Sequence, residues 1–243
     1  MSSRAPYVVP ALKKHTATVI MAHGLGDSGQ GWTSLAQNWR RRGKFEEVTF
    51  IFPNAPSIPV TVNGGMKMPA WHDMSVLGRE LSFEDAPRYQ DEPSALRSRN
   101  YFNTLIQDQI NKGIKPSRIV LGGFSQGGAM AVFTGTTSEE KLGGVFGLSS
   151  YLLLHDRIKN FIPEDFPNKN TPFFLAHGED DPVVKYEFGQ QSYQALKDLG
   201  LQDVEFKSYE DLGHSADPLE IDHLEQFLAK VLPPVGDGEA AGL

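Results

Sequence analysis

The stretch RIVLGGFSQGGAMAVF, residues 118–133, decides the fold. Its first part, RIVL, is a short apolar run with β-branched residues, which is typical of a buried strand. Its last part, GGAMAVF, has the composition of a buried helix. Between them Gly123-Phe-Ser125-Gln-Gly127 matches the G-x-S-x-G pattern, in which a serine occupies a sharp, strained strand-to-helix turn. A plain glycine-rich turn is the competing interpretation, and the flanking strand and helix favour a nucleophile elbow with Ser125 as the nucleophile.

Apolar runs that are closed by Gly or Pro alternate with helical patterns along the whole chain. This alternation predicts the α/β class, with a mostly parallel central sheet and helices on both faces. Together with the elbow it indicates the α/β-hydrolase fold. The expected strands are 16–22, 48–52, 118–121, 144–148, 172–176 and 204–209, and the expected helices are 32–41, 93–111, 129–134, 187–199 and 219–231.

The chain is expected to form a single domain over residues 15–231. Residues 1–14 and 232–243 are rich in breakers or polar residues, so we expect a loosely ordered N-terminal segment and a flexible tail. The segment 151–171 between two predicted strands is too short for a cap domain. The region 53–92 is the largest irregular stretch, and a loop of that length in a compact domain is usually functional.

A serine hydroxyl needs a general base, and in this fold the triad runs Ser, acid, His along the chain. His214 lies in a loop just after the last expected strand, whereas His223 lies inside the last expected helix. This placement favours His214 as the base. The acid should follow the strand between Ser125 and His214, where Glu179-Asp180-Asp181 offers three adjacent carboxylates. Pro182 would stiffen the turn that presents Asp181.

Acyl transfer also requires two hydrogen-bond donors for the oxyanion. One is expected to be the backbone N–H of Gln126, the residue after the nucleophile. The glycine-rich loop HGLGDSGQG, residues 23–31, follows the first expected strand, and we place the second donor at Leu25. Residues 24–29 also satisfy G-x-G-x-x-G, the dinucleotide-binding pattern, but no strand ending in Asp or Glu follows about 20 residues later.

Seven motifs follow one another over about residues 15–231: HGLGDSGQGW (23–32), FPNAP (52–56), MPAWHD (68–73), LGGFSQGGAM (121–130), LSSYL (148–152), HGEDDPVV (177–184) and YEDLGHS (209–215). They make the chain resemble the acyl-protein thioesterase family, also called the lysophospholipase/carboxylesterase type of small α/β-hydrolase. The chain departs from the family at two positions: His72 stands where the family usually has an aromatic residue such as Phe or Tyr, and Leu153 stands where a proline is common.

The resemblance implies an enzyme that hydrolyses palmitoyl and similar thioesters on S-acylated cysteines of proteins. It implies Asp181 as the acid beside Ser125 and His214, with Leu25 and Gln126 as the oxyanion donors. The segment around Trp71 would flank the acyl channel, and Trp71 and Leu77 are the expected substrate-binding residues. S-acylated proteins and lysophospholipids are the expected substrates, and no metal or other cofactor is expected.

Composition excludes several functions. The absence of cysteine excludes disulfides, thiolate metal sites, a cysteine nucleophile and palmitoylation of the chain itself. A net charge of −7 and the lack of a basic stripe argue against nucleic-acid binding. No apolar run approaches the roughly 20 residues of a membrane span, so any membrane contact is expected to be transient and superficial. The start of the chain lacks a secretory pattern, so we expect a cytoplasmic location, to which the resemblance adds the nucleus.

Two alternatives remain at this stage. A lysophospholipase or short-chain carboxylesterase would use the same triad on an oxygen ester. A non-catalytic α/β-hydrolase that senses a ligand is permitted by the fold, although such proteins usually have a broken triad.

Overall fold

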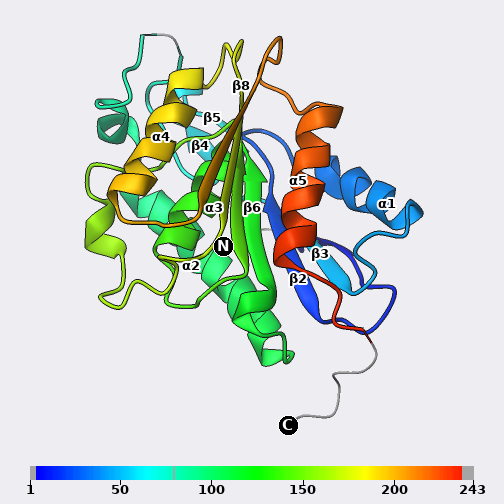
Figure 1. Ribbon diagram of the computed structural model, residues 1–243. Coiled ribbons are helices and arrows are strands. Elements are labelled where there is room, and N and C mark those ends of the chain that lie inside the picture. Colours follow the sequence, from blue (N-terminus) through cyan, green and yellow to red (C-terminus); the bar gives the residue numbers. More distant parts are fainter. Residues whose placement is uncertain (1–3, 79, 237–243) are drawn as a thin grey trace.

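A seven-stranded sheet forms the centre of the molecule (Figure 1). The computed structural model describes residues 4–78 and 80–236. Strand order is β1-β3-β2-β6-β7-β8-β9, and only β1 is antiparallel to its neighbour. The strands are β1 (Tyr7–Val9), β2 (Ala17–Ala22), β3 (Val48–Phe52), β6 (Ile119–Phe124), β7 (Gly144–Leu148), β8 (Phe173–Gly178) and β9 (Val204–Tyr209).

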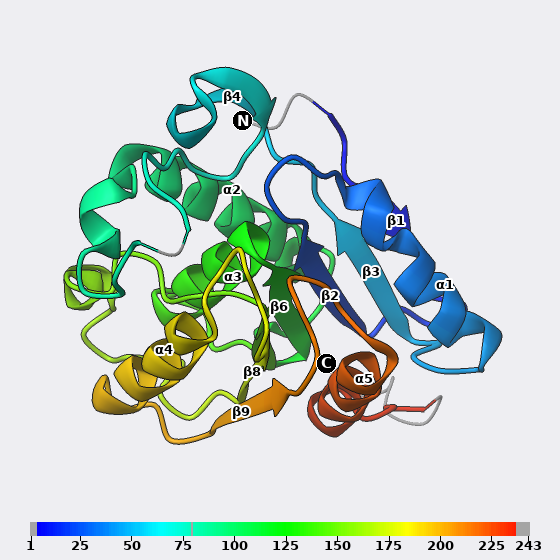
Figure 2. The ribbon, with the colours of Figure 1, turned by 90° about the horizontal axis from the view of Figure 1, so that it is seen from above.

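Helices cover both faces of this sheet. Figure 2 shows α1 and α5 on one face and α2, α3 and α4 on the other. Each face encloses its own apolar core: Trp39 and Phe227 belong to the first, and Phe102 and Met130 to the second. The helices are α1 (Thr33–Arg41), α2 (Glu92–Asn111), α3 (Gln126–Thr136), α4 (Tyr186–Asp198) and α5 (Pro218–Val231), and the short 3-10 helices are η1 (Gly29–Trp32), η2 (Thr61–Asn63), η3 (Ala86–Tyr89), η4 (Pro116–Arg118) and η5 (Ile158–Phe161).

Local sequence signals explain where two of the helices begin. The Asp91 carboxylate accepts a hydrogen bond from Ser94 N at 2.9 Å, and the Asp217 carboxylate accepts one from Glu220 N at 2.8 Å. Each aspartate thereby satisfies a backbone donor that a helix leaves unpaired in its first turn. A proline follows within the first two positions of both helices, where its missing N–H costs nothing.

The ends of the described chain are more ordered than the sequence predicted. Residues 7–9 form β1, which pairs with β3 at the edge of the sheet, so the expectation of a loosely ordered segment is wrong there. Leu232 is 3% exposed, and the Val235 and Gly236 N–H groups each donate to the Glu47 carboxylate at 3.0 Å. A flexible tail is therefore wrong for residues 232–236, while 1–3 and 237–243 lie outside the described residues.

The long region 53–92 contains a small hairpin that the sequence did not predict. Strands β4 (Ser57–Val60) and β5 (Met66–Pro69) pair with each other in a separate two-stranded sheet. Between β7 and β8, only η5 interrupts an otherwise irregular connection, so the described residues contain no cap domain there. None of the described helices combines the length and the apolar character that crossing a membrane would require.

Candidate active site

The serine turn between β6 and α3 has the strained geometry of a nucleophile elbow. Ser125 has φ 54° and ψ −123°, a conformation that L-residues adopt only when the surrounding structure holds them there. A Cβ on Gly127 would lie 2.4 Å from the carbonyl oxygens of both Ala22 and His23. A Cβ on Gly123 would lie 2.5 Å from the Gly127 backbone. Glycine at both positions therefore lets the turn pack directly against the end of β2.

Three of the predicted residues meet at the carboxyl ends of the parallel strands. His214 Nε2 lies 2.9 Å from Ser125 Oγ, and His214 Nδ1 lies 2.7 Å from Asp181 Oδ2. Ser125 follows β6, Asp181 follows β8 and His214 follows β9. These contacts form the relay in which a base can take the serine proton while the carboxylate orients the imidazole.

The Asp181 carboxylate is almost completely buried and yet remains charged. Its Oδ1 accepts hydrogen bonds from Val183 N at 2.8 Å and Val184 N at 2.9 Å. Burial by itself would raise the pKa of Asp181, but hydrogen bonds from His177 and His214 outweigh burial and hold that pKa well below its usual range. The ionised acid is therefore ready to stabilise the imidazolium that forms during catalysis.

The two predicted oxyanion donors lie beside the nucleophile. Leu25 and Gln126 line the same cleft as Ser125 and His214. Gln126 is the first residue of α3, so its backbone N–H has no acceptor within the helix and lies at the positive end of the helix dipole. Both positions suit stabilisation of a tetrahedral intermediate next to Ser125 Oγ.

Comparisons with known proteins agree with this geometry. Residues 4–232 match the phospholipase/carboxylesterase family. The chain belongs to this family. It is 70% identical over 241 residues to acyl-protein thioesterase 1 of Aspergillus fumigatus, covering 99% of this chain and 98% of that protein. It is 49% identical to acyl-protein thioesterase 1 of Neurospora crassa, covering 98% of this chain and 96% of the relative.

Solved structures place the chain in the same group. The crystal structure of Zea mays acyl-protein thioesterase 2 aligns with a TM-score of 0.79 at 33% identity, over 93% of this chain and 98% of that one. The structure of Arabidopsis thaliana SOBER1 aligns with a TM-score of 0.79 at 31% identity, over 89% of this chain and 99% of that one. The predicted α/β-hydrolase fold is confirmed, and this member of the phospholipase/carboxylesterase family is a serine hydrolase.

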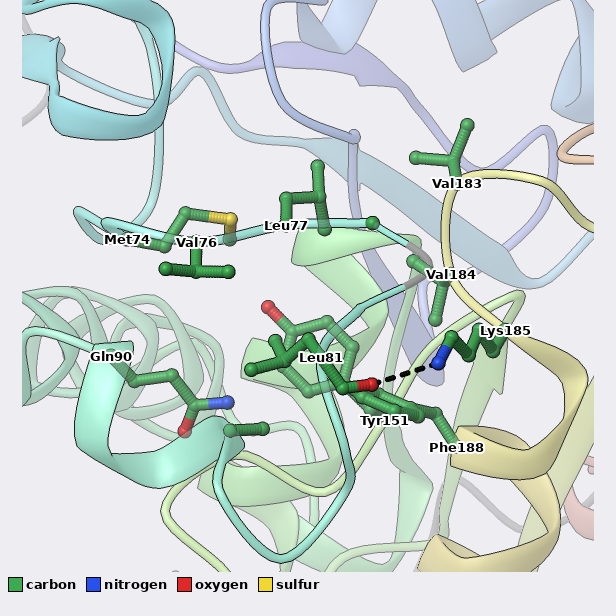
Figure 3. Close-up of a pocket in the computed structure, with 12 residues that line it drawn as sticks. Met74, Val76, Leu77, Leu81, Gln90, Tyr151, Val183, Val184, Lys185 and Phe188 are labelled. Carbon is green, nitrogen blue, oxygen red and sulfur yellow. Dashed lines mark hydrogen bonds between the residues drawn. The ribbon is translucent and has the colours of Figure 1, made fainter.

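In this family member an apolar cavity continues away from the catalytic cleft. The cleft has a volume of about 230 Å³, and the adjoining narrow channel has about 20 Å³, which is room for roughly one water molecule. Figure 3 shows the channel between the segment that carries Met74 and Leu77 and the start of α4. The residues that line both spaces are Met74, Leu77, Tyr151, Val183 and Val184.

The two predicted substrate-binding residues have different positions. Leu77 is 37% exposed and lies where the cleft meets the channel, as a substrate-binding residue should. Trp71 is 1% exposed and lines neither space, so its assignment to direct substrate contact is wrong. The Trp71 ring instead packs against Phe102 and His23, with ring centroids 4.9 and 5.1 Å away.

Two residues next to the site, His177 and Tyr151, were not assigned a role from the sequence. His177 Nε2 donates to Val184 O at 2.8 Å and lies 3.4 Å from Asp181 Oδ2. Gly189 leaves space for this ring, because a Cβ there would lie 2.5 Å from His177 Nδ1. The position of His177 four residues before Asp181 was visible in the sequence, but its orientation depends on α4.

Tyr151 was the other residue missed, although it belongs to the LSSYL motif. Its hydroxyl lies 3.3 Å from His72 Nε2, and His72 Nδ1 lies 3.0 Å from Asp73 O. Burial lowers the pKa of His72 to about 4, so the imidazole is neutral at neutral pH. With Nδ1 donating to the carbonyl, Nε2 accepts the Tyr151 hydrogen and fixes the Tyr151 ring, which lines both the cleft and the channel. Across the described residues, no cluster of three His, Asp or Glu side chains could hold a metal ion.

Proposed function

We propose that this chain is an acyl-protein thioesterase that removes palmitoyl and similar chains from S-acylated cysteines. The proposal rests on one observation. The Ser125 hydroxyl is hydrogen-bonded to His214 and lies in a cleft that continues into an apolar channel. A thioester carbonyl can lie at Ser125 while its acyl chain points toward the channel, which must widen to admit a long chain. The names of its relatives from Aspergillus fumigatus and Neurospora crassa support the same reaction.

Acylation follows from the geometry of the triad. His214 Nε2 takes the Ser125 Oγ proton as Oγ forms a bond to the thioester carbon, and the carbonyl π electrons move to its oxygen. The Leu25 and Gln126 N–H groups stabilise that oxyanion. Collapse of the intermediate breaks the C–S bond, and the departing sulfur takes the proton from His214. Water then attacks the acyl-serine with His214 as the base, which releases the fatty acid and restores Ser125.

The nucleophile is tested with a palmitoyl-cysteine peptide. Ser125→Ala should lower kcat by several orders of magnitude, leaving only the roughly 10³- to 10⁴-fold acceleration that the oxyanion hole and binding supply without a nucleophile. A fluorophosphonate probe should label the unaltered protein and leave the Ser125→Ala variant unlabelled. Failure of the unaltered protein to react with the probe would favour the non-catalytic alternative.

A second candidate is a short-chain carboxylesterase, because one observation favours it. The cleft of about 230 Å³ holds a short acyl group as it stands, whereas the channel of about 20 Å³ must widen for a palmitoyl chain. The channel would also have to widen for the acyl chain of a lysophospholipid. Comparing kcat/KM for acetyl, octanoyl and palmitoyl thioesters with that for lysophosphatidylcholine separates the three activities.

We further propose that the enzyme works in the cytoplasm and nucleus, which a fluorescently tagged full chain would test by microscopy.

A further inference from the structure

Trp71 is hydrogen-bonded to both segments that carry the oxyanion donors. Its indole Nε1–H donates to His23 O at 2.8 Å, two residues before Leu25. Its backbone N–H donates at 2.7 Å to the side-chain Oε1 of Gln126. One buried residue therefore joins the loop after β2 to the first residue of α3, whereas the site itself needs only the N–H groups of Leu25 and Gln126.

The surroundings of Trp71 fix its position tightly. The Gln126 side chain also donates through Nε2 to His72 O at 2.9 Å, so this amide spans two successive backbone groups of the Trp71 segment. Ser98 Oγ on α2 donates to Trp71 O. The indole ring packs on the rings of Phe102 and His23. The polar contacts of Trp71 thus hold this segment between α2, the elbow and the loop after β2.

We propose that Trp71 is a positioning residue that sets the separation between the Leu25 and Gln126 N–H groups. The inference rests on the proposed function, in which these two groups bind the oxyanion. An oxyanion hole works only when its donors lie about 2.7–3.1 Å from the developing charge, and a misplacement of about 1 Å can cost about 100-fold in rate. Loss of the indole N–H frees His23 O and lets the loop that carries Leu25 shift relative to α3.

The chain offers a matched control in a second buried tryptophan. Trp39 on α1 is 2% exposed and packs against Phe45 and Phe50 in the other core. Its Nε1 has no hydrogen-bond partner in the described part of the chain. Trp39→Phe and Trp71→Phe thus remove the same atoms from buried sites, but only the second removes a bond to the oxyanion loop.

The experiment compares substrate binding with transition-state binding. We would measure kcat and KM on a palmitoyl-cysteine peptide and a p-nitrophenyl ester, and Ki for a trifluoromethyl ketone that forms an oxyanion on Ser125. Trp71→Phe should lower kcat about 10- to 100-fold on both substrates, change KM less than about threefold, and raise Ki by the same factor as kcat/KM falls. Trp39→Phe should leave kcat, KM and Ki unchanged while lowering Tm.

A benzothienylalanine at position 71 separates hydrogen bonding from packing, because it keeps the ring shape and lacks the N–H. The proposal requires that this variant reproduce the loss in kcat and in ketone affinity with little change in Tm. An unchanged Ki, or a kcat loss no larger than that of Trp39→Phe, would overturn it. If the unaltered protein cleaves only the p-nitrophenyl ester, the thioesterase proposal fails, and the inference about Trp71 is still decided by the ester and the ketone.

Discussion

His177 Nε2 and His214 Nδ1 converge on one atom, Oδ2 of Asp181, at 3.4 and 2.7 Å. The second oxygen of Asp181 is held by two backbone N–H groups, so the carboxylate is contacted on all sides. Both histidine rings are therefore coupled to the orientation of the acid. His177 does not line the cleft itself; its Nε2 contacts Asp181 Oδ2 and donates to the carbonyl of Val184, which does line the cleft.

Replacing His177 should change the pH dependence of the reaction. His177→Leu removes a donor that helps to lower the pKa of Asp181, so that pKa should rise and the loss of kcat that accompanies protonation of Asp181 at acid pH should begin at a higher pH. At neutral pH we expect kcat to fall about tenfold, because the carboxylate is held less firmly toward His214. His177→Gln places an amide N–H near the Nε2 position and should restore both properties. Identical pH profiles for the Leu and Gln variants would contradict the prediction.

Leu77 should control acyl-chain length. Leu77→Trp adds bulk where the cleft meets the channel, so palmitoyl thioester hydrolysis should fall at least about tenfold in kcat/KM while acetyl ester hydrolysis stays within about threefold. Leu12→Trp is the control, since Leu12 is 64% exposed and lines neither space. A uniform loss over all chain lengths would mean that Leu77 supports the cleft rather than admitting the chain.

The elbow should not accept a methyl group at Gly127. A Cβ there would lie 2.4 Å from two backbone oxygens, which cannot move without distorting β2. We expect Gly127→Ala to lower the free energy of unfolding by about 3 kcal/mol or more, as overpacking against the backbone does. For Gly213→Ala the nearest atom would be 3.9 Å away, so urea denaturation should show a much smaller change. Equal midpoints for the two variants would refute the steric argument.

Glu220 should make the fold less stable as the pH rises. Burial, with Asp217 nearby, raises the pKa of Glu220 to about 8, and its carboxyl oxygens have no hydrogen-bond partner among the described residues. The folded state therefore holds a proton that the unfolded state, with a carboxyl pKa of about 4.3, has already released. This contribution to stability is complete below about pH 4.3 and is lost as pH rises through 8.

Glu220→Gln removes this titration while keeping the shape of the side chain. The free energy of unfolding of this variant, relative to that of the unaltered protein, should rise by roughly 3 to 4 kcal/mol between pH 5 and pH 8. Glu205→Gln is the control, because that carboxylate is half exposed beside Lys207. Parallel stability curves for Glu220→Gln and the unaltered protein over this range would show that the carboxyl ionises freely.

Sequence alone determined the local features of this protein. The strands 48–52, 144–148 and 204–209 were predicted with the bounds that the structure has. The first two are short apolar runs, which have few alternatives in a parallel sheet, and the third was predicted from its alternating pattern before a loop. Ser125 and His214 were predicted from motif and chain order, and the family resemblance selected Asp181 among three adjacent carboxylates; the structure brings the three residues into hydrogen-bond contact. The edge strand β1 was missed, because its pairing with β3 is not visible in so short a segment.

Tertiary structure decided which way the buried side chains face. Trp71 belongs to a motif that suggests an acyl channel, yet its ring points into the core and its hydrogen bonds go to His23 and Gln126. His177 contacts Asp181 because α4 places a glycine against its ring. Motif spacing records which residues follow a strand, but the direction of a side chain depends on packing between segments that are distant in the sequence. For this reason the chemistry could be predicted from the sequence, whereas the residues that position it required the fold.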